Sequence, residues 1–260
     1  MVEAKVVLLS HTPQPEKTVA MAAKVCTSAA PLESIGGGLT EEAAAQFVDM
    51  LAEVGHESPI EHASFTFGLT GVSRSLLAEI TRHRIASYSV RSQRYVDMDA
   101  FEFVVPPEIA GDEELMREYL DAMEEDRRHY ERLCARLTEK RRAAMLAAGA
   151  DAKTAERGAK KKAQEDARFV LPNACATQLV MTMNARSLMN FFRQRCCERA
   201  QWEIRGAAEQ MLTLVLAAAP NLFKNAGPAC LRGPCPEGKM CCGHLAEVRA
   251  RFRALKGGKA

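Results

Sequence analysis

The 260-residue chain has no long apolar run. The best candidate, residues 211–219, reaches about half of the roughly 18 residues that a membrane helix needs. Near the N-terminus, the apolar residues 6–9 are too few for the core of a signal peptide, and no clean small-residue cleavage site follows them. The sequence therefore predicts a cytoplasmic protein without a membrane span.

The sequence also lacks an excess of basic or acidic residues. The chain has 35 Lys and Arg against 33 Asp and Glu, for a net charge of +2, and it contains one Trp and four Tyr. Nucleic-acid-binding domains usually carry a basic field or aromatic side chains on which bases stack. Nucleic-acid binding is therefore not expected from the bulk charge, and any anion site must come from a local cluster.

A disulfide framework is not expected either. Nine cysteines is an odd number, and without a secretion signal they favour reduced thiols or metal ligands. Four of these thiols and one imidazole fall close together, at Cys230, Cys235, Cys241, Cys242 and His244. Their spacing is not the paired CxxC of common zinc sites. Reduced thiols in a capping tail are the favoured interpretation, zinc is the alternative, and no metal site is predicted.

Hydrophobic patterning predicts an α+β fold. Strands are expected at residues 5–9, 64–70 and 176–183, and helices at 15–26, 40–54 and 73–82. Residues 112–168 should be almost entirely helical with a break near Gly149, and a helix at 185–219 has a possible break at Gly206. Residues 36–38 are all glycine and are expected to be irregular.

These elements predict a single α+β domain with a mixed or antiparallel sheet core and a helix-rich middle. No linker is long enough to separate two domains. We expect the domain to span residues 1–222. Residues 223–260 form a Cys-rich and then basic C-terminal tail.

The densest polar cluster spans residues 82–95, with four arginines, one histidine and three serines. Guanidinium groups suit bidentate phosphate binding, and serine hydroxyls add donors. A phosphate or nucleotide site is one interpretation. The other is an exposed basic loop, or arginines paired with Glu79 and Asp97.

Within this cluster the chain resembles a known family. Arg82, His83 and Arg84, then seven residues, then Ser92, match the signature of the flavin-dependent thymidylate synthases, and the match continues through residues 93–95. The resemblance covers roughly residues 5–220. It implies that family's fold and the reductive methylation of dUMP to dTMP. It also implies 5,10-methylenetetrahydrofolate as one-carbon donor and NADPH-reduced FAD as hydride source.

The resemblance assigns the two halves of the motif to different ligands. It implies FAD contacts from Arg82, His83 and Arg84. It implies dUMP contacts from Ser92, Gln93 and Arg94, and Arg82 can also touch dUMP. Glu79 lies one helical turn before Arg82 on the same face, where the family places a glutamine or glutamate that meets the nucleotide.

Residues 55–62 hold two histidines and two acids. A metal site and a capping turn are both open from composition, but Pro59 argues against the one-face helical arrangement of zinc proteases. The segment resembles the family's histidine-rich turn. That resemblance implies that His56 lies near FAD and that His62 supports the loop.

A third cluster begins at Asn184. Arg186 and Asn190 are four residues apart and share a helical face, and Arg195 lies about half a turn away from Arg186. By itself the pattern also fits a capping asparagine followed by solvated arginines. The stretch resembles the family's second flavin motif, which implies FAD contacts from Asn184, Arg186 and Asn190.

The same resemblance makes Arg195 the group that activates the uracil ring. A cation beside the pyrimidine stabilises negative charge that builds on the ring, and such stabilisation is often the largest catalytic contribution. Arg168 matches another dUMP-binding position. Arg199 and Val90 depart from the family pattern, where histidine and an acidic or amide residue occur, and this leaves the fine contacts open.

The resemblance further implies a homotetramer with FAD at subunit interfaces, and a chemistry that needs no cysteine nucleophile. Two other functions remain open from the sequence. One is a flavoprotein of the same fold with another substrate, and the other is a nucleic-acid-binding module that uses residues 82–94.

Overall fold

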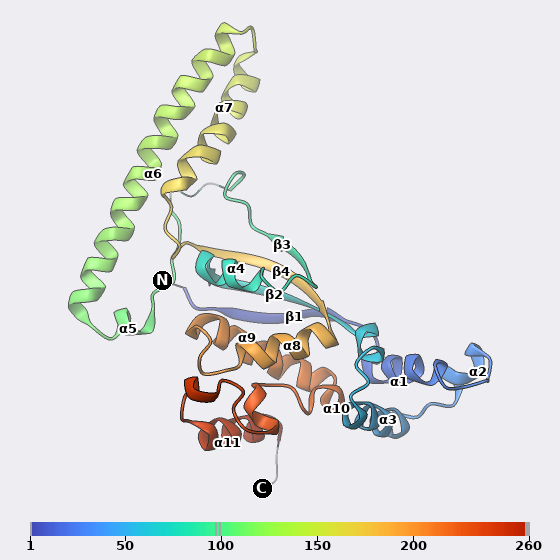
Figure 1. Ribbon diagram of the computed structural model, residues 1–260. Helices are drawn as coiled ribbons and strands as arrows, with labels where there is room; N and C mark the ends of the chain where they lie inside the picture. The colour runs from blue at the N-terminus through green and yellow to red at the C-terminus, as the bar shows by residue number, and fades with distance from the viewer. Residues whose placement is uncertain (1, 97, 99, 258–260) are drawn as a thin grey trace. The chain divides into compact units, whose positions relative to one another are not determined.

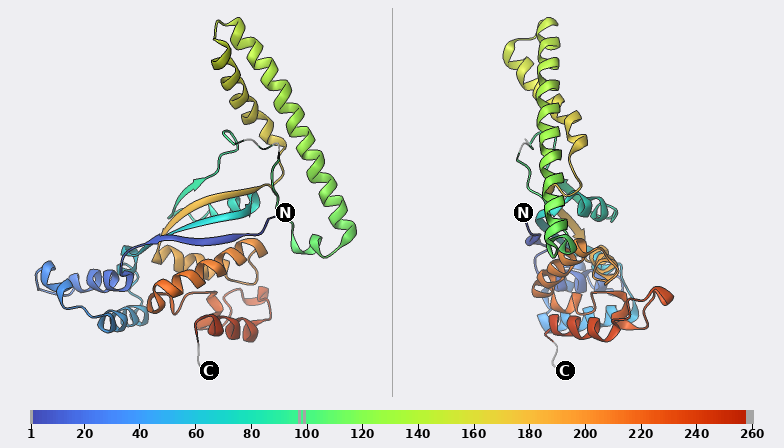
Figure 2. Two further views of the ribbon diagram at one scale, coloured as in Figure 1. Left: turned by 180° about the vertical axis from the view of Figure 1, so that it is seen from behind. Right: turned by 90° about the vertical axis from the view of Figure 1, so that its left-hand side faces the viewer.

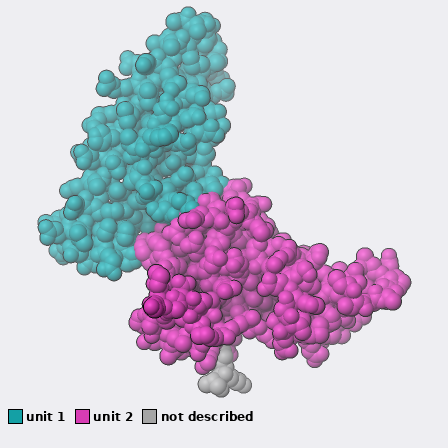
Figure 3. Space-filling view, in the orientation of Figure 1, with its two compact units in different colours: residues 1–3, 70–78, 90–179 teal, residues 4–69, 79–89, 180–260 magenta. Residues whose placement is uncertain are grey.

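A computed structural model describes residues 2–96, 98 and 100–257. The chain divides into two compact units, coloured separately in Figure 3. We name them the sheet unit (residues 4–69, 79–89 and 180–260) and the hairpin unit (residues 1–3, 70–78 and 90–179). Each is described by itself. Asp97, named above as a possible arginine partner, lies outside the described residues.

The sheet has four strands in the order β1-β2-β4-β3 (Figure 1). Their bounds are Lys5–His11 (β1), Ser64–Ser73 (β2), Ser87–Val90 (β3) and Ala176–Asn184 (β4). The end of β1 bonds to the start of β2 through Thr12 N–H and Ser64 O, 2.9 Å apart. The start of β2 lies beside the end of β4, because Ala185 N–H donates to Ala63 O at 2.7 Å. These pairs are antiparallel, and the α+β class with its three expected strands is confirmed. Strand β3 was not predicted.

Helices α8 (Ala185–Arg195) and α9 (Trp202–Ala218) pack against one face of this sheet (Figures 1 and 2). Buried phenylalanines fill the layer between them, with ring centroids 5.8 Å apart for Phe191–Phe192 and 6.1 Å for Phe192–Phe223. Gln210 of α9 bonds both Val6 N–H and Ala4 O of the outer strand, at 3.0 Å each. This amide therefore satisfies backbone groups that an edge strand leaves unpaired.

Two helix predictions were wrong. The helix expected at 185–219 is interrupted at residues 196–201, and Gly206 lies inside α9. The side chain of Gln201 accepts from Glu203 N–H (2.9 Å) and Ile204 N–H (3.2 Å), so it starts a new helix there. The glycine run was expected to be irregular, but α2 (Leu32–Gly37) includes its first two members. A helix of six residues holds these glycines at its end, where glycine is tolerated.

The rest of the sheet unit consists of short elements on either side of the central helices. Thr40 caps α3 as expected, accepting from Ala43 N–H at 3.2 Å.

The expected boundary after residue 222 falls inside α10. In the tail, the side chain of Phe252 on α11 is buried, with 1% of its surface exposed. The elements are α1 (Pro15–Val25), α3 (Glu41–Val54), η1 (Pro59–His62), α10 (Pro220–Phe223), η3 (Ala229–Arg232), η4 (Gly238–Met240) and α11 (Leu245–Leu255).

The hairpin unit is built on two long antiparallel helices, α6 (Glu113–Ala147) and α7 (Ala152–Ala167) (Figure 1). The expected break is confirmed: Gly149 has a φ of 86°, and Asp151 caps α7 by accepting from two amides at 3.1 Å. Buried alanines recur every four residues along α7, which lets the helices approach closely; they are Ala155, Ala159, Ala163 and Ala167. Also present are most of α4 (Arg74–Ile80), then α5 (Pro107–Ala110) and η2 (Arg168–Val170). Among the described residues, no helix is both long and apolar enough to span a bilayer.

Candidate flavin and nucleotide site

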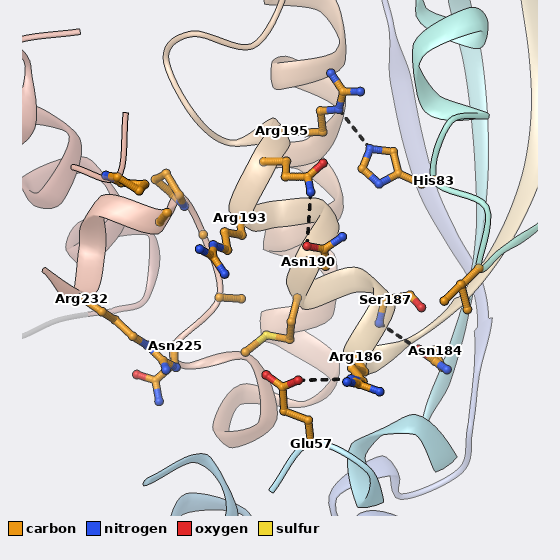
Figure 4. Close-up of a pocket in the computed structure, with 18 of the residues that line it drawn as sticks. Glu57, His83, Asn184, Arg186, Ser187, Asn190, Arg193, Arg195, Asn225 and Arg232 are labelled. Atoms are coloured by element: carbon orange, nitrogen blue, oxygen red, sulfur yellow. Dashed lines mark hydrogen bonds and ion pairs between the residues drawn. The ribbon is translucent and has the colours of Figure 1, made fainter. Parts of the chain in front are cut away.

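A pocket of about 1260 Å³ opens in the sheet unit (Figure 4). Its walls are the exposed side of α8, residues 82–85 after α4, and residues 225–236 of the tail. The volume exceeds the roughly 300–1,000 Å³ of pockets for drug-sized ligands. Several residues expected at the flavin line it together: Arg82, His83, Arg84, Asn184, Arg186, Asn190 and also Arg195.

The segment after α4 is held in place by one phenol. Tyr88 Oη donates toward two backbone carbonyls, Ile80 O at 2.7 Å and His83 O at 2.9 Å. Burial raises the pKa of Tyr88 to about 12, so the hydroxyl keeps its proton. The backbone around the arginine–histidine–arginine triplet is thereby fixed against the end of the helix.

Arg195 reaches this segment from the C-terminal end of α8. Its Nε donates to His83 Nε2 at 3.0 Å (Figure 4). Its Nη1 pairs with Glu79 Oε2 at 2.8 Å. Nη2 makes a longer contact of 3.5 Å to Glu79 O. The Arg195 side chain is 19% exposed. The alternative in which Glu79 pairs with an arginine of the 82–95 cluster is therefore wrong, because Glu79 binds Arg195 instead.

His83 is neutral in this arrangement. Burial first, and then the charge of Arg195, lower its pKa to about 4. Since Arg195 Nε can only donate, His83 Nε2 must accept, and the imidazole proton resides on Nδ1. The ring also packs edge-on against Phe191, with centroids 4.9 Å apart. A neutral histidine can orient the guanidinium without repelling it.

The N-terminus of α8 supplies the opposite part of the pocket. Asn184 Oδ1 accepts from Ser187 N–H at 2.8 Å, which makes it the N-cap of the helix. Arg186 bonds Glu57 at 3.1 Å (Figure 4). It also bonds Glu61 at 2.6 Å. Asn184 therefore caps α8, as one of the two interpretations from the sequence expected. Asn184 also lines the pocket.

His56 does not line this pocket; it is exposed, and its neighbour Glu57 lines the wall instead. The turn at residues 55–62 thus contributes carboxylates rather than an imidazole. Sequence reasoning did not anticipate that Glu57 and Glu61 would pair with Arg186. No local signal marks this contact, because it joins residues more than a hundred positions apart.

The remaining residues that the sequence places at the nucleotide, Ser92, Gln93, Arg94 and Arg168, belong to the hairpin unit. Ser92 Oγ accepts from Arg94 N–H at 3.3 Å and shapes a turn that also contains Gln93. Arg94 Nη1 lies 3.6 Å from Glu165 Oε1, and Arg168 Nε donates to Glu165 O at 3.2 Å. Arg94 and Arg168 therefore both contact Glu165, although they are far apart in sequence.

Sequence reasoning missed a third arginine beside this pair. Backbone bonds join the start of α4 to residues 173–175, a few positions after Arg168: Arg74 N–H donates to Cys175 O at 3.1 Å and Ser75 N–H donates to Asn173 O at 3.2 Å. Burial lowers the pKa of Arg74, and the charge of Arg168 lowers it further. Proximity of two cations favours an anionic ligand between or beside them. Arg74 is the first residue of α4, and no other charged residue lies close to it in the sequence, so the sequence contained no cluster that would single it out.

The pocket in the sheet unit also has lining residues that were not expected. Arg193 follows Arg186 by two helical turns and so shares its face, a spacing that could have been noticed. Asn225 and Arg232 come from the tail, for which no binding role was expected (Figure 4). Arg199, one of the departures from the family pattern, donates to Met240 O at 2.7 Å, and Val90 ends β3.

The fully buried cysteines Cys175 and Cys196 are poor nucleophiles. Burial raises the pKa of Cys175 to about 12, and burial raises the pKa of Cys196 even further. Buried thiols with raised pKa values are inert.

Residues 7–221 match the family model described as thymidylate synthase complementing protein. The chain is 52% identical over 245 residues to the flavin-dependent thymidylate synthase of Clostridium tetani, covering 94% of this chain and 95% of that protein. The chain belongs to the flavin-dependent thymidylate synthase family.

Other relatives in this family are similar over almost their whole length. The flavin-dependent thymidylate synthase of Geobacter sulfurreducens is 45% identical over 253 residues, covering 96% of this chain and 99% of that protein. The one from Pyrococcus horikoshii is 36% identical over 266 residues, covering 96% and 98%. The family resemblance of the motif at residues 82–95 is therefore confirmed, and membership makes the chain a flavin-dependent methyltransferase of the thymidylate synthase class.

Proposed function

We propose that this chain methylates dUMP to dTMP, with FAD as its flavin, 5,10-methylenetetrahydrofolate as one-carbon donor and NADPH as reductant. The observation that carries the proposal is the guanidinium of Arg195. It is held by Glu79 and neutral His83 at the wall of a large polar pocket. Such a fixed cation is what stabilisation of a charged pyrimidine ring requires.

The chemistry of the pocket wall fits a flavin dinucleotide. Cationic and amide donors dominate it, and these are the partners that a pyrophosphate needs. Among the described residues, the acidic ones that line it are Glu57 and Glu61, and Arg186 engages both. A bound flavin would supply the redox chemistry. In this assignment Arg82, Arg84 and Arg186 hold its phosphates, and Asn184 and Asn190 bind its polar edges.

Arg195 is assigned to the uracil ring. Three of its N–H groups are engaged by His83 and Glu79, and the remaining ones are available to a ligand. A guanidinium remains protonated throughout turnover, so it stabilises negative charge without a proton transfer. Because both partners fix its plane, little reorganisation is needed when charge develops on the ring.

The nucleotide phosphate is assigned to the arginines of the hairpin unit. Arg94 and Arg168 meet at Glu165, and Arg74 lies near Arg168. The Arg94 ion pair is long and its side chain is 42% exposed, so the guanidinium can exchange Glu165 for a phosphate at small cost. Ser92 and Gln93 add polar groups in the adjoining turn.

We propose further that the enzyme is a homotetramer with FAD at subunit interfaces. The residues assigned to flavin belong to the sheet unit, and most of those assigned to dUMP belong to the hairpin unit. A site assembled from more than one subunit would accommodate this division. Light scattering of the purified protein should give four times the chain mass of 28.5 kDa, and a monomer that turns over would contradict the assembly.

The function is tested by product formation. The purified protein, supplied with FAD, dUMP, 5,10-methylenetetrahydrofolate and NADPH, should form dTMP that is separated by chromatography. Omission of any one component should abolish the product. A protein that binds flavin but forms no dTMP under these conditions would instead be a flavoprotein with another substrate.

A further inference from the structure

Four thiols of the tail and Cys197, which follows α8, lie together and are not used by the proposed reaction. Four of them, Cys197, Cys230, Cys235 and Cys242, line one cavity of about 590 Å³ in the sheet unit. Cys241 is exposed beside them. Within the part of the chain that the structure describes, no three Cys, His, Asp or Glu side chains are positioned to hold one metal ion. The cluster therefore needs an interpretation other than a preformed metal centre.

Two arginines fix the loop that carries these thiols. Arg249 Nε donates to Cys230 O at 3.0 Å, and its Nη2 donates to Gly233 O at 2.6 Å. On the far side of the loop, Arg199 donates to Met240 O at 2.7 Å. Cys235 lies two residues after the fixed Gly233, and Cys241 directly follows the fixed Met240. Their separation is thus set by the fold rather than by a free chain.

Two backbone hydrogen bonds place Cys235 and Cys241 in consecutive tight turns: Gly238 N–H donates to Cys235 O at 3.3 Å, and Cys241 N–H donates to Gly238 O at 3.2 Å. Each thiol shifts the pKa of the other. Gly243 N–H donates to Cys241 Sγ at 3.5 Å. This amide first, and then the Cys235 thiol, lower the pKa of Cys241. For Cys235, the backbone amide of Glu237 lowers the pKa, but burial and the neighbouring thiols outweigh it, so that the pKa is raised. Cys241 is thus the better nucleophile of the pair, and Cys235 lies beside it.

We propose that Cys235 and Cys241 form a dithiol modification site that reacts with small organic disulfides and closes to a disulfide within the chain. The Cys241 thiolate attacks one sulfur of the small disulfide, forms a mixed disulfide and releases one small thiolate. The Cys235 thiolate then attacks Cys241 Sγ, which releases the second small thiolate. The two cysteines lose two protons and two electrons, and the small disulfide gains them as two thiols.

Cys242 is a poorer partner for Cys241 although it is adjacent in sequence. A disulfide usually needs a Cα separation of about 4.4–6.8 Å, whereas consecutive Cα atoms lie only about 3.8 Å apart. A bond between neighbours therefore distorts the backbone. Cys235 is separated from Cys241 by the short turn η4, which carries no such restriction.

The site adjoins the candidate flavin pocket. Pro234 and Pro236, on either side of Cys235, both line that pocket. Closing a disulfide at Cys235 would fix this stretch of the pocket wall. The inference itself depends only on the thiols and stands whether or not the proposed function is correct.

The experiment uses the full chain with oxidised glutathione as the probe. After oxidation and alkylation of free thiols, trypsin should release residues 233–239 and 240–249 joined as one cross-linked species. Dithiothreitol should separate them. In C235S the mixed disulfide should accumulate on Cys241. In C241S the Cys235–Cys241 bond cannot form, and any cross-link of the same two peptides through Cys242 should form at least about tenfold more slowly.

Two matched variants locate the reaction. C26S removes an exposed thiol outside the tail and should leave the cross-link unchanged. C242S should also retain it, because Cys242 shares a tryptic peptide with Cys241 but is not the assigned partner. The proposal is overturned if C241S closes at the wild-type rate, if C242S loses the cross-link, or if no cross-link forms. It is equally overturned if the thiols react only after a chelator has removed bound zinc.

Discussion

Arg195 and Glu79 are joined by an ion pair of 2.8 Å between residues far apart in sequence, with the two side chains 19% and 31% exposed. The same guanidinium is held on its Nε side by His83. A cation restrained on two sides keeps its orientation without a bound ligand. This restraint is the physical basis for assigning Arg195 to charge stabilisation.

Arg195→Ala should retain the fold and bound flavin but lose turnover by about a hundredfold or more, because charge on the pyrimidine ring goes unstabilised. The measurement is kcat for dTMP formation alongside the flavin absorbance of the purified variant. Arg128→Ala, which removes an exposed arginine on α6, is the control and should behave as wild type. Undiminished kcat in Arg195→Ala would refute the assignment.

Glu79 should act through Arg195, as a positioning residue. Glu79→Gln keeps an acceptor for Arg195 Nη1 and should retain activity within about tenfold. Glu79→Ala leaves the guanidinium restrained by His83 alone and should lose more activity. The kcat and KM for dUMP separate orientation from binding. Equal losses in both variants would show that the charge of Glu79, rather than its hydrogen bond, is what matters.

His83 should remain neutral well below its ordinary titration range. Its pKa is lowered to about 4, so the folded state binds the proton less readily than the unfolded chain does. The resulting contribution to stability is complete above the ordinary pKa of about 6.5 and is lost as the pH falls toward 4. NMR titration of the imidazole tests this directly. A midpoint near 6.5 would mean that the ring is neither buried nor bonded to Arg195 as described.

Arg94→Ala should weaken dUMP binding by about tenfold and leave flavin binding unchanged, because a phosphate loses one charge-assisted partner. Isothermal titration with dUMP measures the effect. Arg91→Ala changes an exposed arginine in the same segment and serves as the matched control. If both variants bind dUMP equally well, the phosphate site does not include Arg94.

Asn184 has two assigned roles that substitutions can separate. Asn184→Ala should destabilise the protein by about 1 kcal/mol through loss of the N-cap of α8. Asn184→Ser keeps the cap but not the amide, so it should preserve stability and weaken flavin affinity. Thermal unfolding and flavin titration together decide the matter: full flavin affinity in the serine variant would leave only the capping role.

Much of the fold was predictable because its signals are local. Thr40 is a capping residue that indicates the start of a helix, and Gly149 indicates a helix end through its backbone conformation. Alternating burial with a period of two residues is typical of a strand such as β4. The interruption after α8 was missed, because Gly206 is a stronger local signal than the capping glutamine at 201. Glutamine is not among the residues that prefer the N-cap position, so the capping role of Gln201 has no clear signal in the sequence.

The candidate site was predictable to a similar degree. The family resemblance implies that His83 and Arg186 contact FAD and that Arg195 acts on the uracil ring, and the three residues line one pocket. Glu57 and Arg232 reach the same pocket from distant segments, and Arg74 approaches Arg168 only through the packing of the hairpin unit. No local pattern encodes these approaches, since each depends on which segments the fold brings side by side.

The most direct test of the central claim follows the hydrogen at carbon 5 of the pyrimidine. With dUMP tritiated at that position, the complete enzyme should release tritium to water in step with dTMP formation, and Arg195→Ala should release it at least about a hundredfold more slowly. Formation of dTMP without tritium release, or equal release by wild type and Arg195→Ala, would contradict the account.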